Sequence, residues 1–293
     1  GPIADRINII GGDAAGRAAV SQIRKGAPDA DIIALEKGDR PSYAACGIPF
    51  LVGGEVEGGF DQLVARSPER HRAKGLDLRT RHEATAIDTA ARTVEVQDLD
   101  ADERFTLEFD QLLIGTGGTP IRPPFPGIDL PFVHGVHGLD TAAQLLAAIE
   151  DDATENVVVV GAGYIGLEMA EAFLHRGRTP VVVEMAPHPL TLLDPEMSGL
   201  VSDAMVERGI DLRTDTAVEG FEPGLVHTSN GSIPADLVVL GIGLGPNSQL
   251  GAEAGLELGV RDAIVVDERM QTSVDGIWAA GDCVESTHLV TGD

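Results

Sequence analysis

The stretch Gly161-Ala162-Gly163-Tyr164-Ile165-Gly166 decides how this 293-residue chain is expected to fold. Four valines at residues 157–160 precede it, and a helical pattern continues from it to about Arg176. Glycines at this spacing let the backbone approach a pyrophosphate, and the helix that follows presents unpaired N–H groups to the phosphates. The next predicted strand, residues 181–183, ends in Glu184, an acid suited to a ribose 2′-hydroxyl and thus to NADH over NADPH. The stretch therefore predicts a strand–turn–helix unit that binds a dinucleotide.

A second, weaker copy of the pattern stands at the start of the chain. Residues 6–10 form a short apolar run, and Gly11-Gly12-Asp13-Ala14-Ala15-Gly16 follows it. The next predicted strand, residues 31–35, ends in Glu36. Because Asp13 replaces the middle glycine, this turn taken alone is equally typical of an ordinary strand–helix connection. The repeat as a whole predicts an α/β fold with two Rossmann-like, three-layer ββα dinucleotide-binding domains.

The rest of the chain fits two such domains, one inserted in the other. Residues 82–109 contain three short strands joined by polar turns, which predicts a β-meander and not another helix-linked unit. Residues 120–131 are rich in proline and predict a linker. The first domain is expected to comprise residues 1–118 and 244–293, and the inserted domain residues 119–243.

The charge of the chain is lopsided, with 47 acidic and 21 basic residues and a net charge of −26. Nucleic acid and anionic membranes would be repelled, so neither is an expected partner. The chain lacks the ~20-residue apolar run of a membrane span, and its start lacks the features of a signal peptide, which predicts a cytoplasmic protein. Two cysteines, Cys46 and Cys283, are too few for a disulfide scaffold. No metal site is expected.

Two later segments, added to the glycine turns, resemble the pyridine nucleotide-disulfide oxidoreductase superfamily. Thr116-Gly117 closes a strand at a glycine turn, and Ala279-Ala280-Gly281-Asp282 places an acid just after a strand. The resemblance covers nearly the whole chain and implies FAD in the first domain and NAD(P)H, with NADH favoured, in the inserted one. The FAD site that it implies consists of Gly11, Gly12, Ala15, Gly16, Glu36, Lys37, Ser42, Ala84, Thr116, Gly117, Gly281 and Asp282. The NAD(P)H site consists of Gly161, Gly163, Tyr164, Ile165, Gly166, Glu168, Glu184 and Gly243.

The role of Glu168 within that second site has two interpretations. It resembles a family glutamate that lies close to the nicotinamide and the flavin. It is also what an ordinary acid in the first turn of a helix looks like, where a negative charge is favourable to the helix dipole.

The segment Ser42-Tyr43-Ala44-Ala45-Cys46-Gly47 resembles the Ser-Tyr-x-Asn-Cys-Gly motif of the superfamily's single-cysteine branch. A thiolate beside a flavin can exchange electrons with a sulfur substrate, so Cys46 is the expected redox centre; the alternative is a buried structural cysteine. Ala45 stands where the family has Asn, which removes one hydrogen bond near the thiolate or the substrate. Cys283, just after Asp282, is expected to pack near the flavin.

Within this branch the chain resembles the coenzyme A-disulfide reductases most. NADH oxidases and NADH peroxidases have a His in the first glycine turn at the position of Ala14. The resemblance implies electron transfer from NAD(P)H through flavin and Cys46 to a low-molecular-weight disulfide such as coenzyme A disulfide. It implies a coenzyme A site formed by Ala18, Gln22, Lys25, Ser42 and Lys74, although the two lysines are equally typical of a solvated surface.

Two alternatives remain open from the sequence. One is an NADH oxidase that reduces oxygen. The other is a truncated, non-catalytic flavin-binding module, because the family is homodimeric and its C-terminal dimerisation domain is expected to be absent here.

Overall fold

The structure is a computed structural model that describes residues 5–11, 14–38, 52–55, 69, 72–73, 76–136 and 139–286. The chain divides into two compact units. Unit 1 takes its residues from Gly1–Tyr43, Ala65–Thr119 and Leu244–Asp293, and unit 2 from Ala44–Val64 and Pro120–Gly243. Among the described residues no helix is both long and apolar enough to cross a membrane.

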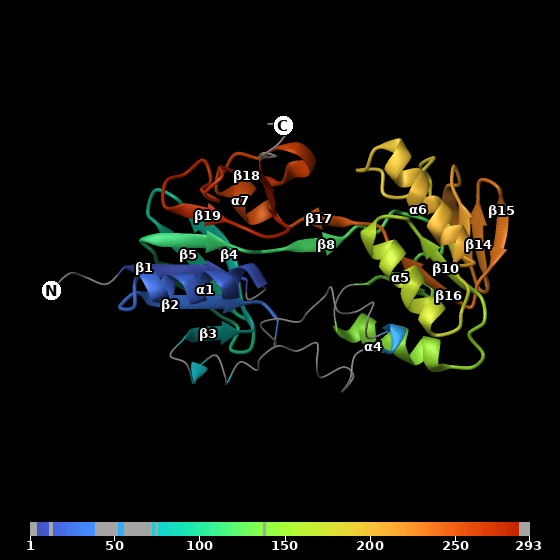
Figure 1. Ribbon diagram of the computed structural model, residues 1–293. Helices are drawn as coiled ribbons and strands as arrows, with labels where there is room; N and C mark the ends of the chain where they lie inside the picture. The colour runs from blue at the N-terminus through green and yellow to red at the C-terminus, as the bar shows by residue number, and fades with distance from the viewer. Residues whose placement is uncertain are drawn as a thin grey trace. The chain divides into compact units, whose positions relative to one another are not determined.

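Unit 1 is built on a five-stranded sheet whose neighbouring strands are all parallel (Figure 1). The strand order is β19-β7-β1-β2-β3. An antiparallel meander of three strands packs against this sheet. The elements are β1 (Arg6–Ile10), α1 (Ala14–Gly26), β2 (Asp31–Glu36), β3 (Asp77–Thr80), the meander β4 (His82–Asp88), β5 (Thr93–Asp98) and β6 (Glu103–Glu108), then β7 (Gln111–Ile114) and β19 (Ile277–Ala279).

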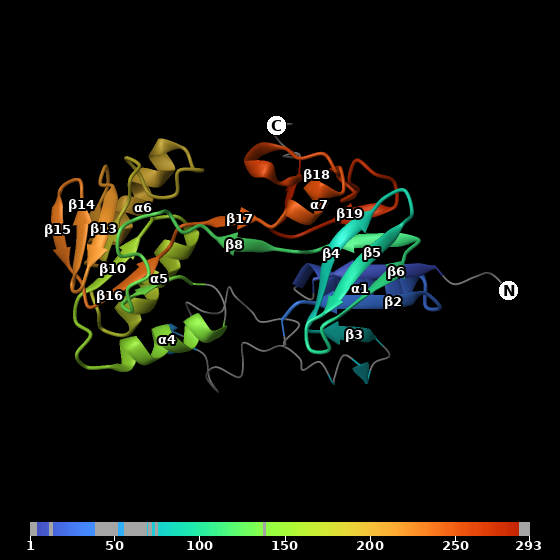
Figure 2. The same cartoon turned by 180° about the vertical axis from the view of Figure 1, so that it is seen from behind.

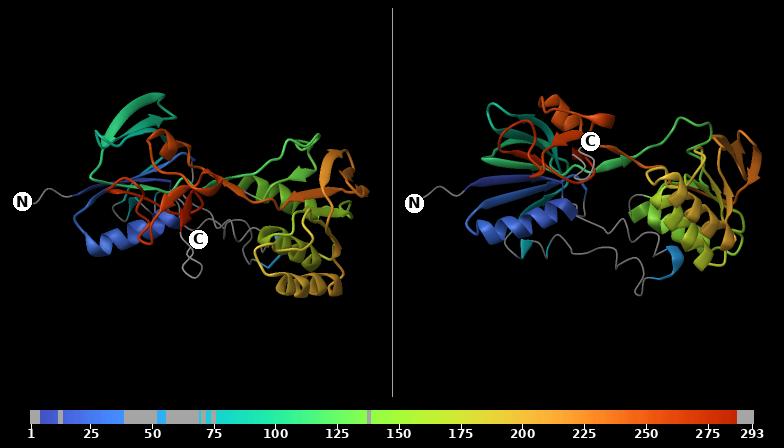
Figure 3. Two further views of the ribbon diagram at one scale, coloured as in Figure 1. Left: turned by 90° about the horizontal axis from the view of Figure 1, so that it is seen from above. Right: turned by 45° about the horizontal axis from the view of Figure 1, so that its top comes forward.

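Successive residues of β1 point to opposite faces of the sheet, as the pleat of a strand requires. Ile9 packs in a core with Val20 of α1, and Ile10 packs in a second core with Val94 of the meander. The layers of unit 1 are therefore helix, sheet and meander, as Figures 2 and 3 show with α1 on one face and β4, β5 and β6 on the other. A strand with apolar side chains on both faces must be covered twice, which this arrangement achieves.

Unit 2 repeats this architecture with the strand order β12-β11-β10-β16-β9. On one face Val158 and Val160 pack with Val226 of a second meander, and α5 contacts β10 and β16. The predicted duplication and the ββα layers are confirmed. The elements are β9 (Val133–His134), α4 (Leu139–Glu150), β10 (Val157–Val160), α5 (Tyr164–His175), β11 (Val181–Val183), α6 (Pro195–Glu207), β12 (Asp211–Arg213), the meander β13 (Val218–Glu222), β14 (Leu225–Thr228) and β15 (Gly231–Pro234), then β16 (Leu237–Leu240).

The chain crosses between the units along a small two-stranded sheet, and no helix or strand lies between residues 120 and 133, where a linker is predicted. That sheet pairs β8 (Gly118–Pro120), at the first crossing, with β17 (Leu244–Pro246), at the second. The chain then forms further short elements of unit 1: α7 (Gln249–Glu253), the 3-10 turn η3 (Val260–Asp262), β18 (Ile264–Val266) and β20 (Val284–Ser286).

The edge strands β3 and β12 share one sequence. Asp77-Leu78-Arg79-Thr80 forms β3, and Asp211-Leu212-Arg213-Thr214 covers β12 and the next residue. In both strands the arginine donates from Nε and Nη2 to the aspartate two residues earlier, at 3.2 and 3.0 Å in β3 and at 3.2 and 2.9 Å in β12. Charged side chains along an exposed edge disfavour pairing with a further strand.

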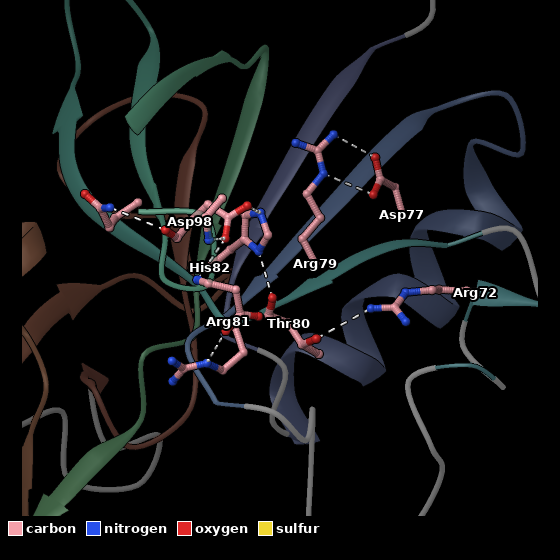
Figure 4. A network of polar contacts seen from close by, with 10 residues as sticks. Arg72, Asp77, Arg79, Thr80, Arg81, His82 and Asp98 are labelled. Carbon is pink, nitrogen blue, oxygen red and sulfur yellow. Dashed lines mark hydrogen bonds and ion pairs between the residues drawn. The ribbon is translucent and has the colours of Figure 1, made fainter. Parts of the chain in front are cut away.

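A polar network surrounds the turn from β3 to β4 (Figure 4). His82 Nδ1 lies 2.7 Å from the Thr80 carbonyl oxygen, and its Nε2 lies 3.4 Å from Asp98 Oδ2. The pKa of Asp98 is lowered, chiefly by the hydrogen bond from the Ala101 amide. Arg72 donates from Nε to the Leu78 carbonyl at 3.0 Å. The network joins the edge of the sheet to the meander and has a structural role.

Candidate dinucleotide sites

The glycine turn of unit 2 joins three strands and a helix through contacts that only glycine permits. Gly161 has a φ of +98°, and its amide donates to the Val183 carbonyl at 2.8 Å. A Cβ at Gly166 would lie 1.9 Å from the Gly161 carbonyl oxygen, and a Cβ at Gly241 would lie 2.7 Å from Gly166 Cα. The ends of β10, β11 and β16 thus meet the start of α5 at one edge of the sheet, where ligands of such folds bind.

Gly163 differs from these packed glycines. A Cβ there would meet no described heavy atom within 4 Å, so the fold itself leaves this position open. Gly163 is also the N-cap of α5 and provides no side-chain cap. The first N–H groups of α5 therefore face outward with the positive end of the helix dipole, which favours an anion.

Glu184 lies at the end of β11 with both carboxylate oxygens oriented by backbone amides. Oε2 accepts a hydrogen bond from Ala162 N at 2.7 Å, and Oε1 accepts one from Ala186 N at 3.0 Å. The side chain is only half-buried, so its remaining acceptor capacity faces solvent. Other predicted residues surround the turn: Tyr164 and Gly243 are exposed, and Ile165 and Glu168 are half-buried.

The turn of unit 1 has the same geometry although its sequence pattern is weaker. Gly11 has a φ of +97°, and its amide donates to the Leu35 carbonyl at 2.8 Å. A Cβ at Gly11 would lie 1.9 Å from the Gly115 carbonyl oxygen, and one at Gly16 would lie 2.5 Å from the Gly11 carbonyl oxygen. Glu36 Oε1 accepts a hydrogen bond from the amide two residues later, Gly38 N, at 2.9 Å. Glu184 Oε1 accepts one from Ala186 N in the same way.

The predicted sites do not include the two glycines that close these turns. The Gly115 amide donates to the Ile10 carbonyl at 2.7 Å, and the Gly241 amide donates to the Val160 carbonyl at 2.8 Å. Each follows the last apolar residue of a strand, β7 or β16, and that shared position was the available signal.

The remaining predicted FAD residues of unit 1 have varied surroundings. Thr116 donates from Oγ1 to the Asn247 carbonyl at 2.5 Å, and Gly117 and Gly281 have φ values of +71° and +84°. Asp282 is exposed. Lys37 forms an ion pair with Glu83 at 3.1 Å. Ala84 packs against the core beneath the meander.

The predicted coenzyme A residues that the structure describes share one surface. Ala18, Gln22 and Lys25 are all exposed on α1, at spacings of four and three residues that place them on one face. Four predicted site residues lie outside the described part of the chain, as does the side chain of Ala15: Gly12, Ser42, Cys46 and Lys74.

Cys283 occupies the core of unit 1. Its side chain is fully buried, with Sγ 3.4 Å from the Ala280 carbonyl oxygen and 3.7 Å from that of Ile114. A thiol enclosed in this way is inert compared with an exposed thiolate.

A family model described as pyridine nucleotide-disulphide oxidoreductase matches residues 5–292. The chain belongs to this family. The predicted family resemblance and the Rossmann-type fold are thus both confirmed. Among solved structures, reduced Bacillus anthracis CoADR-RHD matches with a TM-score of 0.91 and 31% identity, covering 99% of this chain and 53% of that one. An NAD-dependent persulfide reductase from A. fulgidus matches with a TM-score of 0.90 and 38% identity, covering 98% and 55%.

Curated members of the family match over most of this chain. An NADH oxidase of Methanocaldococcus jannaschii is 35% identical over 98% of the chain, and an NAD(P)H sulfur oxidoreductase (CoA-dependent) of Pyrococcus abyssi is 34% identical over 97%. The chain spans 65% and 64% of the length of these relatives.

Proposed function

We propose that this family member is an FAD-dependent NAD(P)H:disulfide oxidoreductase. Electrons would pass from NAD(P)H through flavin and Cys46 to a low-molecular-weight disulfide such as coenzyme A disulfide. The observation that carries the proposal is the pair of close-packed glycine turns, each accompanied by an acid at the end of the next strand. We assign FAD to residues 1–118 and 244–293, and NAD(P)H to residues 119–243.

The residues of unit 2 fit a nicotinamide dinucleotide. The open position at Gly163 and the uncapped start of α5 suit the pyrophosphate, and the half-buried Glu184 suits the hydroxyls of a ribose. A 2′-phosphate would place a second anion beside the Glu184 carboxylate, so we favour NADH. Tyr164 and Gly243 would border the same ligand.

The residues of unit 1 fit FAD on similar grounds. Its turn reproduces the packing of Gly161 and Gly166 with Gly11 and Gly16, and Glu36 ends the second strand. The exposed carboxylate of Asp282 follows Gly281 and would accept hydrogen bonds from sugar-alcohol hydroxyls. The chemistry that FAD supplies when bound is acceptance of a hydride equivalent and release of two electrons.

The chain's own reactive group would be Cys46. Its thiolate attacks one sulfur of the disulfide, a bond to that sulfur forms, and the other sulfur leaves and takes up a proton. Two electrons and one proton then cleave the new bond, which releases the second thiol and restores the thiolate. The motif around Cys46 supports this role, since the residue lies outside the described part of the chain. Glu168 would border the nicotinamide.

The substrate is proposed to contact α1. Lys25 would pair with phosphate groups, and Ala18 and Gln22 on the same exposed face would leave room for a long, polar ligand. Relatives support this class of substrate, because they include a coenzyme A disulfide reductase of Staphylococcus aureus, 28% identical over 96% of this chain. The two cysteines and the net charge of −26 further favour a small-molecule reaction in a reducing cytoplasm.

An NADH oxidase is the second candidate, because the M. jannaschii relative carries that name. Measurements of oxygen uptake and of NADH oxidation distinguish the two functions. The FAD-loaded protein is given NADH first in air and then, without oxygen, with coenzyme A disulfide. We expect NADH oxidation to depend on the disulfide and oxygen uptake to be slow. Sustained oxygen uptake with no response to the disulfide would establish the oxidase, and no NADH oxidation under either condition would leave a non-catalytic flavin-binding module.

A further inference from the structure

The backbone that carries the Glu184 carboxylate is held by the stretch of chain at the end of β12. The Glu184 amide donates to the Arg213 carbonyl at 2.9 Å, and the Glu184 carbonyl accepts from the Thr216 amide at 3.0 Å. Two residues later, the Ala186 carbonyl accepts from the Asp215 amide at 3.1 Å. The pair Asp215 and Thr216 therefore determines the path of the chain just after β11, where the acid lies.

This pair is held in turn by Asn230, at the turn between β14 and β15. Asn230 donates from Nδ2 to Thr216 Oγ1 at 2.9 Å and to the Asp215 carbonyl at 3.4 Å. The Thr216 side chain is buried, and its hydroxyl donates to the Thr214 carbonyl at 2.9 Å, so it both donates and accepts. Asp215 has a φ of +51°. Residues other than glycine adopt this left-handed conformation uncommonly, so the contacts around Asp215 help to determine it.

The turn itself fixes the backbone of Asn230. The Asn230 amide donates to Thr228 Oγ1 at 3.1 Å, and the Thr228 hydroxyl donates to the Gly231 carbonyl at 2.6 Å. Asn230 is exposed and Thr228 is buried, so the turn is anchored from below while its carboxamide is directed at Asp215 and Thr216. Two successive hydrogen-bonded steps thus connect this turn to the backbone of Glu184.

We infer that Asn230 is a positioning residue for Glu184. By holding Asp215 and Thr216, it keeps the backbone of Glu184 in the place from which the carboxylate accepts from the Ala162 amide and faces the proposed ribose. Hydrogen bonds weaken steeply when their geometry departs from the optimum, so a small shift of the carboxylate weakens its bonds to ribose hydroxyls. The inference concerns the proposed NAD(P)H site and rests on the proposed function.

Ser229, the neighbour of Asn230 in the same turn, provides a matched control. Its Oγ accepts from the Ala217 amide at 3.0 Å. Ser229→Ala and Asn230→Ala therefore each remove side-chain hydrogen bonds between this turn and the stretch that follows β12. Ala217 lies one residue beyond the pair that bonds to the backbone of Glu184 and Ala186. Only Asn230→Ala releases that pair.

The experiment measures the Kd of the oxidised, FAD-loaded protein for ADP-ribose by isothermal titration calorimetry. ADP-ribose has the pyrophosphate and the riboses of NADH but cannot transfer a hydride, so binding is observed without turnover. We expect Asn230→Ala to raise the Kd about fivefold, because hydrogen bonds of the misplaced carboxylate are weakened. Ser229→Ala should leave the Kd unchanged.

A double-mutant cycle separates positioning of Glu184 from a general structural effect. Asn230→Ala should weaken binding in the wild type and have no effect in the Glu184→Ala background, where no carboxylate remains to be placed. A fivefold loss in both backgrounds would overturn the inference, as would an unchanged Kd in Asn230→Ala alone. Equal losses in Asn230→Ala and Ser229→Ala would overturn it as well.

A second variant approaches the same contact from the buried side. Thr216→Val keeps the shape of the side chain but removes the oxygen that accepts from Asn230. It should also raise the Kd, again only when Glu184 is present, and an unchanged Kd contradicts the inference even if Asn230→Ala fails to fold. A failure of the proposed function has a different signature: the wild type would bind no ADP-ribose, and the inference would fall with the site. Tight binding by the wild type that Asn230→Ala leaves unchanged refutes the inference alone.

Discussion

The Glu184 carboxylate accepts a hydrogen bond from the Ala162 amide across 2.7 Å, which fastens the end of β11 to the glycine turn of unit 2. The same side chain accepts from Ala186 N at 3.0 Å. Glu184 is therefore oriented by the backbone before any ribose arrives. The acid stabilises the turn as well as the proposed ligand, so its removal should affect both.

Replacing Glu184 by Ala tests this double role. We expect kcat/KM for NADH to fall at least about tenfold, as loss of a charge-assisted hydrogen bond implies, while kcat/KM for NADPH changes little. The free energy of unfolding should fall by about 1–3 kcal/mol, because two amides lose their acceptor. Steady-state kinetics with both cofactors and urea denaturation give the two values. An unchanged preference for NADH would show that Glu184 does not contact the ribose.

Two glycines of one turn should respond differently to alanine. Gly166→Ala forces a Cβ to within 1.9 Å of a backbone oxygen, and we expect it to destabilise unit 2 by at least about 1–3 kcal/mol. Gly163→Ala has open space around its Cβ, so it should fold like the wild type and yet bind NADH more weakly, because the methyl group occupies the pyrophosphate position. Thermal melts and NADH titrations separate the effects. Equal melting temperatures for the two variants would contradict the packing argument.

Asn247 follows β17 and forms hydrogen bonds with residues in and just before β8. It donates from Nδ2 to the Thr116 carbonyl at 3.0 Å, and its Oδ1 accepts from Thr119 Oγ1 at 2.7 Å. Asn247→Ala should lower the free energy of unfolding by about 1–2 kcal/mol through these two bonds. It should also loosen Thr116 beside the proposed flavin and raise the Kd for FAD. A Kd for FAD equal to that of the wild type would show that the hydrogen bonds of Asn247 do not influence the flavin site.

Acid stability should depend on Asp110. Hydrogen bonds from the Arg6 side chain and amide lower its pKa to about 2. Because the folded pKa lies below the unfolded one, of about 4, this contribution is complete above pH 4 and is lost as the pH falls from about 4 to about 2. Asp110→Asn should therefore be less stable than the wild type at neutral pH and should show a shallower loss of stability across that window. Parallel curves for the two proteins would contradict this assignment.

Much of the fold was predictable because the decisive signals are local. The valines of β10, the glycines at 161, 163 and 166, and Glu184 at the end of the next strand indicate one βαβ unit, and the weaker copy of this pattern indicates the second. The meander of residues 82–109 was also predicted and is confirmed as β4, β5 and β6. The family resemblance followed from the two glycine turns combined with Thr116-Gly117 and Ala279-Ala280-Gly281-Asp282.

Other elements escaped prediction for physical reasons. The edge strands β3 and β12 pair on one side only and carry charged side chains, so hydrophobic periodicity does not reveal them. Their identical sequence, Asp-Leu-Arg-Thr, was nevertheless a visible sign of the duplication. The second meander, β13 to β15, was missed although Pro223-Gly224 and Asn230-Gly231 mark its two turns.

The site was less predictable than the fold. The closing glycines Gly115 and Gly241 contact turns that lie about 80 to 100 residues earlier in the sequence. Their place after a strand marks them as turn residues, but it does not indicate which turn each one contacts. The hydrogen bond from Arg176 to the Val52 carbonyl likewise joins residues that are distant in the sequence. Pairs of this kind become visible only once the tertiary structure is known.

The central claim is tested most directly by counting thiols released in one anaerobic turnover. FAD-loaded protein is reduced with one equivalent of NADH, coenzyme A disulfide is added, and flavin absorption is followed together with released thiol, in the wild type, Cys46→Ser and Cys283→Ser. We expect the flavin to reoxidise with two thiols released per flavin in the wild type and in Cys283→Ser. Cys46→Ser should be reduced by NADH and then stay reduced. Equal thiol release from Cys46→Ser, or a wild-type flavin that reoxidises only in air, would contradict the account.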